Sequence, residues 1–151
     1  MNTIPLVDLK RVHLRIAREL TQAMEEVIGN NQFINGPALA TFEKNFAAYC
    51  GKKHALGVAS GTDALTLALI AYNITQAEVI VPANTFVATA LAIKHSGNTP
   101  VFVDCEVGTY NINCHLLEGA ISEKSRAIMI PHTLGNPCDM DAVMGIAGAR
   151  G

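Results

Sequence analysis

Half of the 151 residues are hydrophobic, 16% are charged, and the formal net charge is −2. A chain of this length suits one ordinary domain and not comfortably two, and so small a net charge argues against general affinity for nucleic acid or acidic membranes. No stretch approaches the ~20 apolar residues that span a bilayer. Asp8, Lys10 and Arg11 stand where a signal peptide would have its apolar core, so we expect a cytoplasmic protein.

The first part of the chain predicts two helices. Across residues 11–28, apolar residues recur every three or four positions, which is the pattern of one helix face. Residues 29–31 (GNN) tolerate the left-handed conformation that ends many helices. Pro37 suits the first turn of a second helix, which we expect to stop at Gly51.

From residue 54 onward, apolar strands alternate with helices. The expected strands are 54–59 (HALGVA), 78–82 (EVIVP), 100–104 (PVFVD) and 126–131 (RAIMIP). The expected helices begin at Thr62, span 85–97, lie around 116–121, and follow an N-cap at Asp139 or Asp141. Crossover helices between apolar strands predict an α/β fold with a mostly parallel sheet that helices cover on both faces.

The chain stops at Gly151, after the helix of the fourth strand–helix unit. A helix of this kind normally returns its chain to the sheet. We therefore expect a truncated piece of a larger α/β protein, and the alternative is an edge helix that closes a small domain.

The four cysteines are scattered and form no CxxC pair, which in a cytoplasmic chain is typical of free thiols. They are Cys50, Cys105, Cys114 and Cys138. No two potential ligands have the spacing of a zinc site, so the sequence predicts no bound metal.

A turn of small and hydroxylated residues, Ser60 to Asp63, joins the first expected strand to its helix. A helix N-terminus offers unpaired N–H groups and the positive end of a dipole, which suit a phosphate. Gly61 allows close approach, and Ser60 and Thr62 can add hydroxyl donors. The turn matches neither a Walker loop nor a dinucleotide fingerprint, and an ordinary turn capped by Thr62 is the alternative.

A second strand end presents Asn84, Thr85 and Phe86 at the same edge of the predicted sheet. An aromatic ring there can stack on a planar ligand ring. The alternative is that Phe86 belongs to the core at the start of an apolar helix.

Four segments resemble, in order and wording, the DegT/DnrJ/StrS family of enzymes, which use pyridoxal 5'-phosphate (PLP) and act on nucleotide-linked keto sugars. The segments are 36–69 (GPALATFEKNFAAYCGKKHALGVASGTDALTLAL), 79–93 (VIVPANTFVATALAI), 100–113 (PVFVDCEVGTYNIN) and 122–143 (SEKSRAIMIPHTLGNPCDMDAV), and the opening IPLVDLKR is similar too. The resemblance implies a fold-type I large domain, a smaller C-terminal domain and a homodimer with active sites at its interface. Residues 1–36 would form an N-terminal extended segment and helix, and 37–151 the N-terminal portion of the PLP-binding domain.

The resemblance also implies site residues. Gly61, Thr62 and Asp63 correspond to the grip on the cofactor phosphate, with Ser60 beside them, and Phe86 to the aromatic that stacks on the pyridine ring. Asp63 could equally cap its helix. His132 corresponds to a family histidine that either contacts cofactor or substrate or braces its loop. Asp104 and Tyr110 also recur in the family, and we interpret them mainly as structural.

Two groups that PLP chemistry needs are missing from the chain. In the family, the aspartate that holds the ring nitrogen and the Schiff-base lysine both fall beyond Gly151. None of the lysines present stands at a strand end that faces the proposed phosphate; they are Lys10, Lys44, Lys52, Lys53, Lys94 and Lys124. The chain alone is therefore predicted not to transaminate.

The leading functional hypothesis is part of an aminotransferase that moves an amino group from an amino acid, glutamate, to a nucleotide-linked keto-deoxy sugar. The run HTLGNPCD is similar to the sugar 3-dehydratase branch of the family, which is the alternative. A non-catalytic truncated product and an unrelated nucleotide-binding α/β domain are the hypotheses from other classes.

Overall fold

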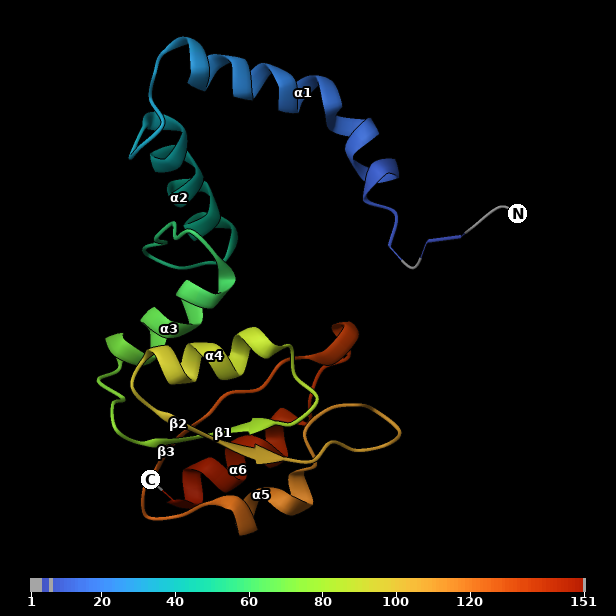
Figure 1. Cartoon of the computed structure of the whole chain (residues 1–151), viewed down its shortest axis with the longest axis vertical. Helices are drawn as coiled ribbons and strands as arrows, with labels where there is room; N and C mark the ends of the chain where they lie inside the picture. The colour runs from blue at the N-terminus through green and yellow to red at the C-terminus, as the bar shows by residue number, and fades with distance from the viewer. Residues whose placement is uncertain (1–3, 6, 151) are drawn as a thin grey trace. The chain divides into compact units, whose positions relative to one another are not determined.

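The computed structural model describes residues 4, 5 and 7–150 (Figure 1). The chain divides into two compact units, Met1–Gly57 and Val58–Gly151. Residues 1–3 and 6 of the predicted extended segment lie outside the described residues. In the part of the chain that the structure describes, no helix has the length and apolar character needed to cross a membrane.

The first unit contains the two predicted helices. α1 (Leu9–Gly29) begins where the Asp8 carboxylate accepts a hydrogen bond from the Arg11 amide, at 3.2 Å. It ends as predicted, with the following Asn31 in the left-handed region at φ 52°. α2 (Pro37–Tyr49) has its proline in the first turn, and Gly51 follows it with a φ of 62°. Both helix predictions are confirmed, because the caps and the turn residues agree with the apolar periodicity.

The second unit is built on a parallel three-stranded sheet with the strand order β2-β1-β3. The strands are β1 (Glu78–Pro82), β2 (Thr99–Val103) and β3 (Ser125–Ile128). β1 lies in the centre, and its residues from Val79 to Pro82 are buried. The expected mostly parallel α/β sheet is confirmed.

Helices cover both faces of this sheet, as predicted (Figure 1). α3 (Gly61–Ala71) and α4 (Val87–His95) pack on one face, and α5 (Cys114–Ala120) and α6 (Met140–Arg150) on the other. The alternation of side chains along β1 creates two cores. Val79 and Val81 pack with Leu69 and Ile93, while Ile80 packs in a separate cluster; that cluster includes Val103, Ile112, Leu117 and Val143.

One predicted strand is absent: residues 54–59 form no strand in the described chain. A strand requires a neighbour that takes its backbone groups. Here the Gly57 amide instead donates to the Glu43 side chain, at 2.7 Å. The apolar run is not buried either, with Leu56 77% exposed, so the prediction of a buried strand here, and of four strands in all, was wrong.

The ends of the remaining elements agree with the prediction to within a few residues. β3 ends at Ile128 rather than 131, although the Met129 amide still donates to the Ile80 carbonyl at 2.8 Å. Of the two caps proposed for α6, Asp139 is the one used, because its carboxylate accepts from the Ala142 amide at 2.9 Å.

Candidate functional site

The turn that starts α3 is a tight capping arrangement. Ser60 has extended backbone angles (φ −155°, ψ 164°), and its hydroxyl accepts from the Asp63 amide at 3.1 Å. The same hydroxyl donates to the Asp63 carboxylate at 2.9 Å. Ser60 and not Thr62 therefore caps the helix, which corrects the alternative interpretation of the turn. The Asp63 contacts are those of a capping residue, and its charge is favourable beside the positive end of the helix.

This capping leaves two backbone donors free at the start of α3. The described residues provide no hydrogen-bond acceptor for the amides of Gly61 and Thr62. A methyl group built on Gly61 would meet no atom within 4 Å, so no side chain crowds the Cα of this residue. Two free N–H groups at a helix N-terminus fit the phosphate that the sequence predicted.

The loop between β1 and α4 presents an aromatic ring to solvent. Phe86 is the N-cap residue of α4 and is 78% exposed, so it is not part of the core that the described residues form. Two hydrogen bonds fix the loop. The Asn84 side-chain amide donates to the Tyr110 carbonyl at 2.8 Å, and the hydroxyls of Thr85 and Thr89 lie 2.9 Å apart. A fixed backbone with an exposed ring is what a stacking residue needs.

The loop between β3 and α6 carries His132, whose ring is exposed. Its Nδ1 accepts a hydrogen bond from the Cys138 amide at 3.1 Å, which closes the loop around the short 3₁₀ turn η1 (Thr133–Gly135). This contact is the bracing role that the sequence left open. It engages one ring nitrogen and leaves Nε2 for a ligand.

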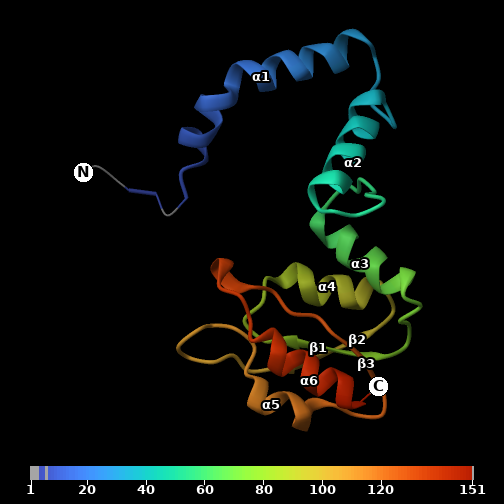
Figure 2. The ribbon, with the colours of Figure 1, turned by 180° about the vertical axis from the view of Figure 1, so that it is seen from behind.

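The loops that follow the three strands meet at the carboxyl edge of the sheet (Figure 2). The loop between β2 and α5 is hydrogen-bonded to the other two loops. The Asn84 side-chain amide donates to the Tyr110 carbonyl, and the Thr133 backbone amide donates to the Asn111 side chain. α3 packs on α4, where the Thr66 hydroxyl lies 3.5 Å from the Ala92 carbonyl. Within the described residues, no hydrogen bond joins the Ser60–Asp63 turn to these loops.

The residue that sequence reasoning missed is Asn111. Its neighbour Tyr110 was interpreted as structural, and Tyr110 does hold a left-handed backbone at φ 58° and accepts from Asn84. Asn111 is 6% exposed and bonds residues that lie 22 to 26 positions away in the sequence. The only local signal was an asparagine placed in a strand-end loop.

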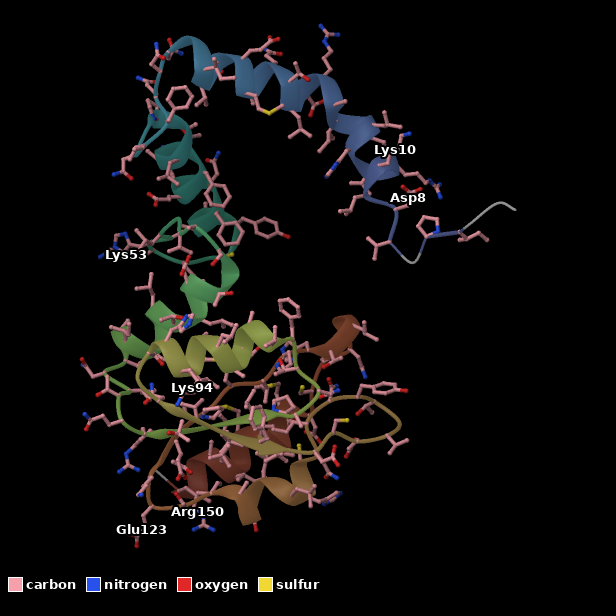
Figure 3. All side chains as sticks on the ribbon, viewed as in Figure 1. Asp8, Lys10, Lys53, Lys94, Glu123 and Arg150 are labelled. Atoms are coloured by element: carbon pink, nitrogen blue, oxygen red, sulfur yellow. The ribbon has the colours of Figure 1, made fainter. Side chains whose placement is uncertain are left out.

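The two lysines of the second unit lie away from the loops at this edge. Lys94 lies in the last turn of α4, at the end opposite Phe86 (Figure 3), and Lys124 precedes β3. Both side chains are exposed. In the described part of this unit, no lysine stands beside the free amides of α3.

A profile of the DegT/DnrJ/EryC1/StrS aminotransferase family matches residues 14–151. This chain belongs to that family. The resemblance seen in the sequence is therefore confirmed. A dTDP-3-amino-3,6-dideoxy-α-D-galactopyranose transaminase of Aneurinibacillus thermoaerophilus is 44% identical over 95% of the chain and 40% of its own length. A dTDP-3-amino-3,4,6-trideoxy-α-D-glucose transaminase of Streptomyces venezuelae is 40% identical over 98% of the chain and 39% of its own length.

Solved structures of the same family share the fold. S. venezuelae DesV matches with a TM-score of 0.90 and 38% identity, over 99% of this chain and 41% of that one. The Escherichia coli GDP-4-keto-6-deoxy-D-mannose-3-dehydratase, solved with bound hydrated PLP, matches with a TM-score of 0.76 and 30% identity, over 86% of this chain and 35% of that one. The chain thus spans about 40% of the length of the curated relatives it matches.

Proposed function

We propose that the chain is the N-terminal part of the large domain of a PLP-dependent aminotransferase, with residues 1–36 as a leading segment and helix and 37–151 as the cofactor-binding portion. The full-length enzyme would transfer an amino group from an amino acid, glutamate, to a nucleotide-linked keto-deoxy sugar, as a cytoplasmic homodimer. The two transaminases of dTDP-linked sugars at 44% and 40% identity support this substrate class.

The start of α3 would hold the cofactor phosphate. The amides of Gly61 and Thr62 donate to its oxygens, and the Thr62 hydroxyl can add a third donor. Ser60 and Asp63 hold the shape of this turn through their mutual hydrogen bonds. The positive end of the helix dipole stabilises the charge of the phosphate.

The two strand-end loops would hold the rest of the cofactor. When bound, PLP supplies the electron sink for the substrate carbon. Phe86 would stack on the pyridine ring and exclude water from one of its faces, and Nε2 of His132 would donate a hydrogen bond to cofactor or substrate. The relative with bound hydrated PLP supports this assignment of the cofactor.

The single observation that carries the proposal is the pair of free amides at Gly61 and Thr62. It can be tested with Gly61→Pro, which removes one N–H from the first helical position, where proline is tolerated. The extended backbone of Ser60 is also compatible with a following proline. Pyridoxamine phosphate is the appropriate probe, because it lacks the aldehyde that reacts with surface lysines. We expect about tenfold weaker binding, as for one hydrogen bond to a charged group.

Two controls accompany this measurement. Met140→Pro likewise removes the N–H of the first residue of α6, together with the methionine side chain, and should leave binding unchanged because α6 lies on the other face of the sheet. Pyridoxamine, which has no phosphate, should bind much more weakly than pyridoxamine phosphate, and ATP and NAD should compete poorly. Equal binding by wild type and Gly61→Pro, or by the two pyridoxamines, contradicts the proposed site.

The chain alone is proposed to lack transamination. Incubation with PLP, borohydride reduction and peptide mass spectrometry should show no stoichiometric adduct at a single lysine, and no turnover of glutamate should accompany it. A unique reduced lysine together with turnover would overturn this part of the proposal.

A sugar 3-dehydratase is the second candidate. The solved dehydratase relative at 30% identity and the HTLGNPCD segment favour it, while the curated transaminases are closer in sequence. The reading frame beyond the Gly151 codon separates the candidates, since the resemblance implies a lysine in the aminotransferases and a histidine in the dehydratases. A stop codon there would instead support the non-catalytic product.

A further inference from the structure

We propose that Asn111 is a positioning residue that fixes the His132 loop, so that the His132 ring keeps Nδ1 as an acceptor and presents its proton on Nε2. The inference rests on the proposed function only in taking the carboxyl edge of the sheet as the ligand-binding edge. The hydrogen bonds themselves carry the rest.

Asn111 uses its whole side-chain amide on one loop. Its Nδ2 donates to the carbonyls of Asn136 and Pro137, at 3.2 and 3.0 Å. Its Oδ1 accepts from the Thr133 amide at 3.2 Å. A buried amide with both donors and the acceptor engaged admits one orientation, so this side chain defines where the loop lies.

These contacts flank the hydrogen bond of His132 on both sides. Thr133 directly follows His132, and Pro137 directly precedes Cys138, whose amide donates to Nδ1 at 3.1 Å. Asn111 therefore holds both ends of the loop at the separation that this hydrogen bond requires. Loss of the Asn111 amide would release the ring without removing any atom of His132 or Cys138.

The loop needs this support because its own conformation is unfavourable. Leu134 adopts the left-handed region at φ 54° and is 96% exposed, so no packing of its side chain offsets the cost. Within the loop, the Gly135 amide donates to the His132 carbonyl, the Asn136 amide to the Thr133 carbonyl, and the Cys138 thiol to the Pro131 carbonyl at 3.2 Å. Three hydrogen bonds to Asn111 tie the loop to the rest of the sheet edge, and the Asn136 side chain adds a longer one to the Thr109 carbonyl, at 3.5 Å.

The consequence for His132 is a fixed tautomer. A ring nitrogen that accepts a hydrogen bond from a backbone amide carries no proton, so the neutral ring carries its proton on Nε2. An exposed Nε2–H can donate to a ligand oxygen. Bracing and ligand binding thus use different nitrogens of one ring, and the two roles left open by the sequence are compatible.

Nitrogen-15 NMR of the ring in the full 151-residue chain tests the proposal, with the signals assigned through His132→Gln. In wild type at a pH where the ring is neutral, we expect the shifts of an Nε2–H tautomer. In Asn111→Ala we expect a mixture of both tautomers and at least tenfold faster hydrogen exchange of the Cys138 amide. Wild-type shifts and exchange in this variant would overturn the proposal.

A matched variant separates positioning from general destabilisation. Asn98→Ala removes another buried asparagine of the same unit, 2% exposed, which holds the amide of Ala77 and the carbonyl of Ile74. It should lower stability and leave the His132 shifts unchanged; altered shifts would count against the proposal. If Asn111→Ala does not fold, Asn111→Asp keeps an acceptor for Thr133 but cannot donate, and should release the ring partially.

The proposed function can fail separately. If Gly61→Pro bound pyridoxamine phosphate as wild type does, the proposed phosphate site would be wrong. The effect of Asn111 on the His132 tautomer could still be observed. If both Asn111 variants kept the wild-type nitrogen-15 shifts of His132, the positioning role of Asn111 would be wrong, and the proposed phosphate site would be unaffected.

Discussion

Each end of the parallel sheet has a buried asparagine whose side chain ties neighbouring segments together. The two ends differ in which side chains around that asparagine are exposed. At the amino end, Asn98 bonds the Ala77 amide, the Ile74 carbonyl and Ser96. At the carboxyl end, Asn111 ties loops together in the same way, and the adjoining loop, which Asn84 joins to Tyr110, carries the exposed ring of Phe86. A buried asparagine alone thus marks a well-tied loop, and the exposed ring beside such a loop marks the candidate ligand site.

The largest loss of stability is expected from a substitution at the amino end of the sheet. Asn98→Ala leaves the buried Ala77 N–H and the part-buried Ile74 carbonyl without partners, and a fully buried unsatisfied group costs about 1–3 kcal/mol. Because the carbonyl is only part-buried and costs less, we expect urea unfolding to show a loss of about 2–4 kcal/mol. Asn84→Ala is the comparison at the carboxyl end, and because its side chain is exposed it should cost less than about 1.5 kcal/mol. Equal losses in the two variants would contradict the view that the burial of Asn98 sets the size of its effect.

The capping turn of α3 should show the next effect. Ser60→Ala removes the acceptor for the Asp63 amide and should cost about 1 kcal/mol, whereas Ser60→Gly should cost only a few tenths. Urea unfolding of both variants checks this order. A reversed order would mean that Ser60 does not cap the helix.

Phe86→Ala should separate stability from binding. The ring is 78% exposed, so its removal should change the free energy of unfolding by less than about 0.5 kcal/mol. Loss of stacking at about 1 kcal/mol should weaken pyridoxamine phosphate binding about fivefold, as measured by equilibrium titration. Phe86→Tyr keeps the ring and should bind as wild type does. A large loss of stability in Phe86→Ala would instead mean that the Phe86 side chain contributes to the hydrophobic core.

The smallest effect concerns thiol reactivity. Burial, with Asp139 and Glu106 nearby, raises the pKa of Cys114. Less of this thiol is ionised near neutral pH, so it should react with iodoacetamide more slowly than the exposed Cys50, by peptide mass spectrometry. The rate should rise as the pH increases. Faster alkylation of Cys114 than of Cys50 at neutral pH would contradict this expectation.

The sequence predicted most of the elements because their signals are local. Apolar runs and caps located β1, α2 and the Asp139 cap of α6, which the structure confirms. The strand at 54–59 failed because pairing depends on a neighbour that a local pattern does not specify. The cap of α3 was placed two residues late, because Ser60 and Thr62 are chemically equivalent until the backbone angles distinguish them.

The candidate site was predicted only in part for a related reason. Gly61, Phe86 and His132 stand directly after or between apolar runs, so their positions were readable from the sequence. Asn111 acts through bonds to a loop 22 to 26 residues further along the chain, and no spacing rule connects the two.

The strand order β2-β1-β3 has one more consequence. After β1 the chain passes through α4 to β2, on one side of β1, and later adds β3 on the other side of β1. The order of the strands therefore reverses at the carboxyl end of β1. Doubly wound sheets receive their ligands at such a topological switch point. Asn84–Phe86 and His132 are the residues that follow the two strands at this point. The location of the candidate site is therefore a property of the connectivity, and substitutions there can change which ligand binds more readily than they can move the site.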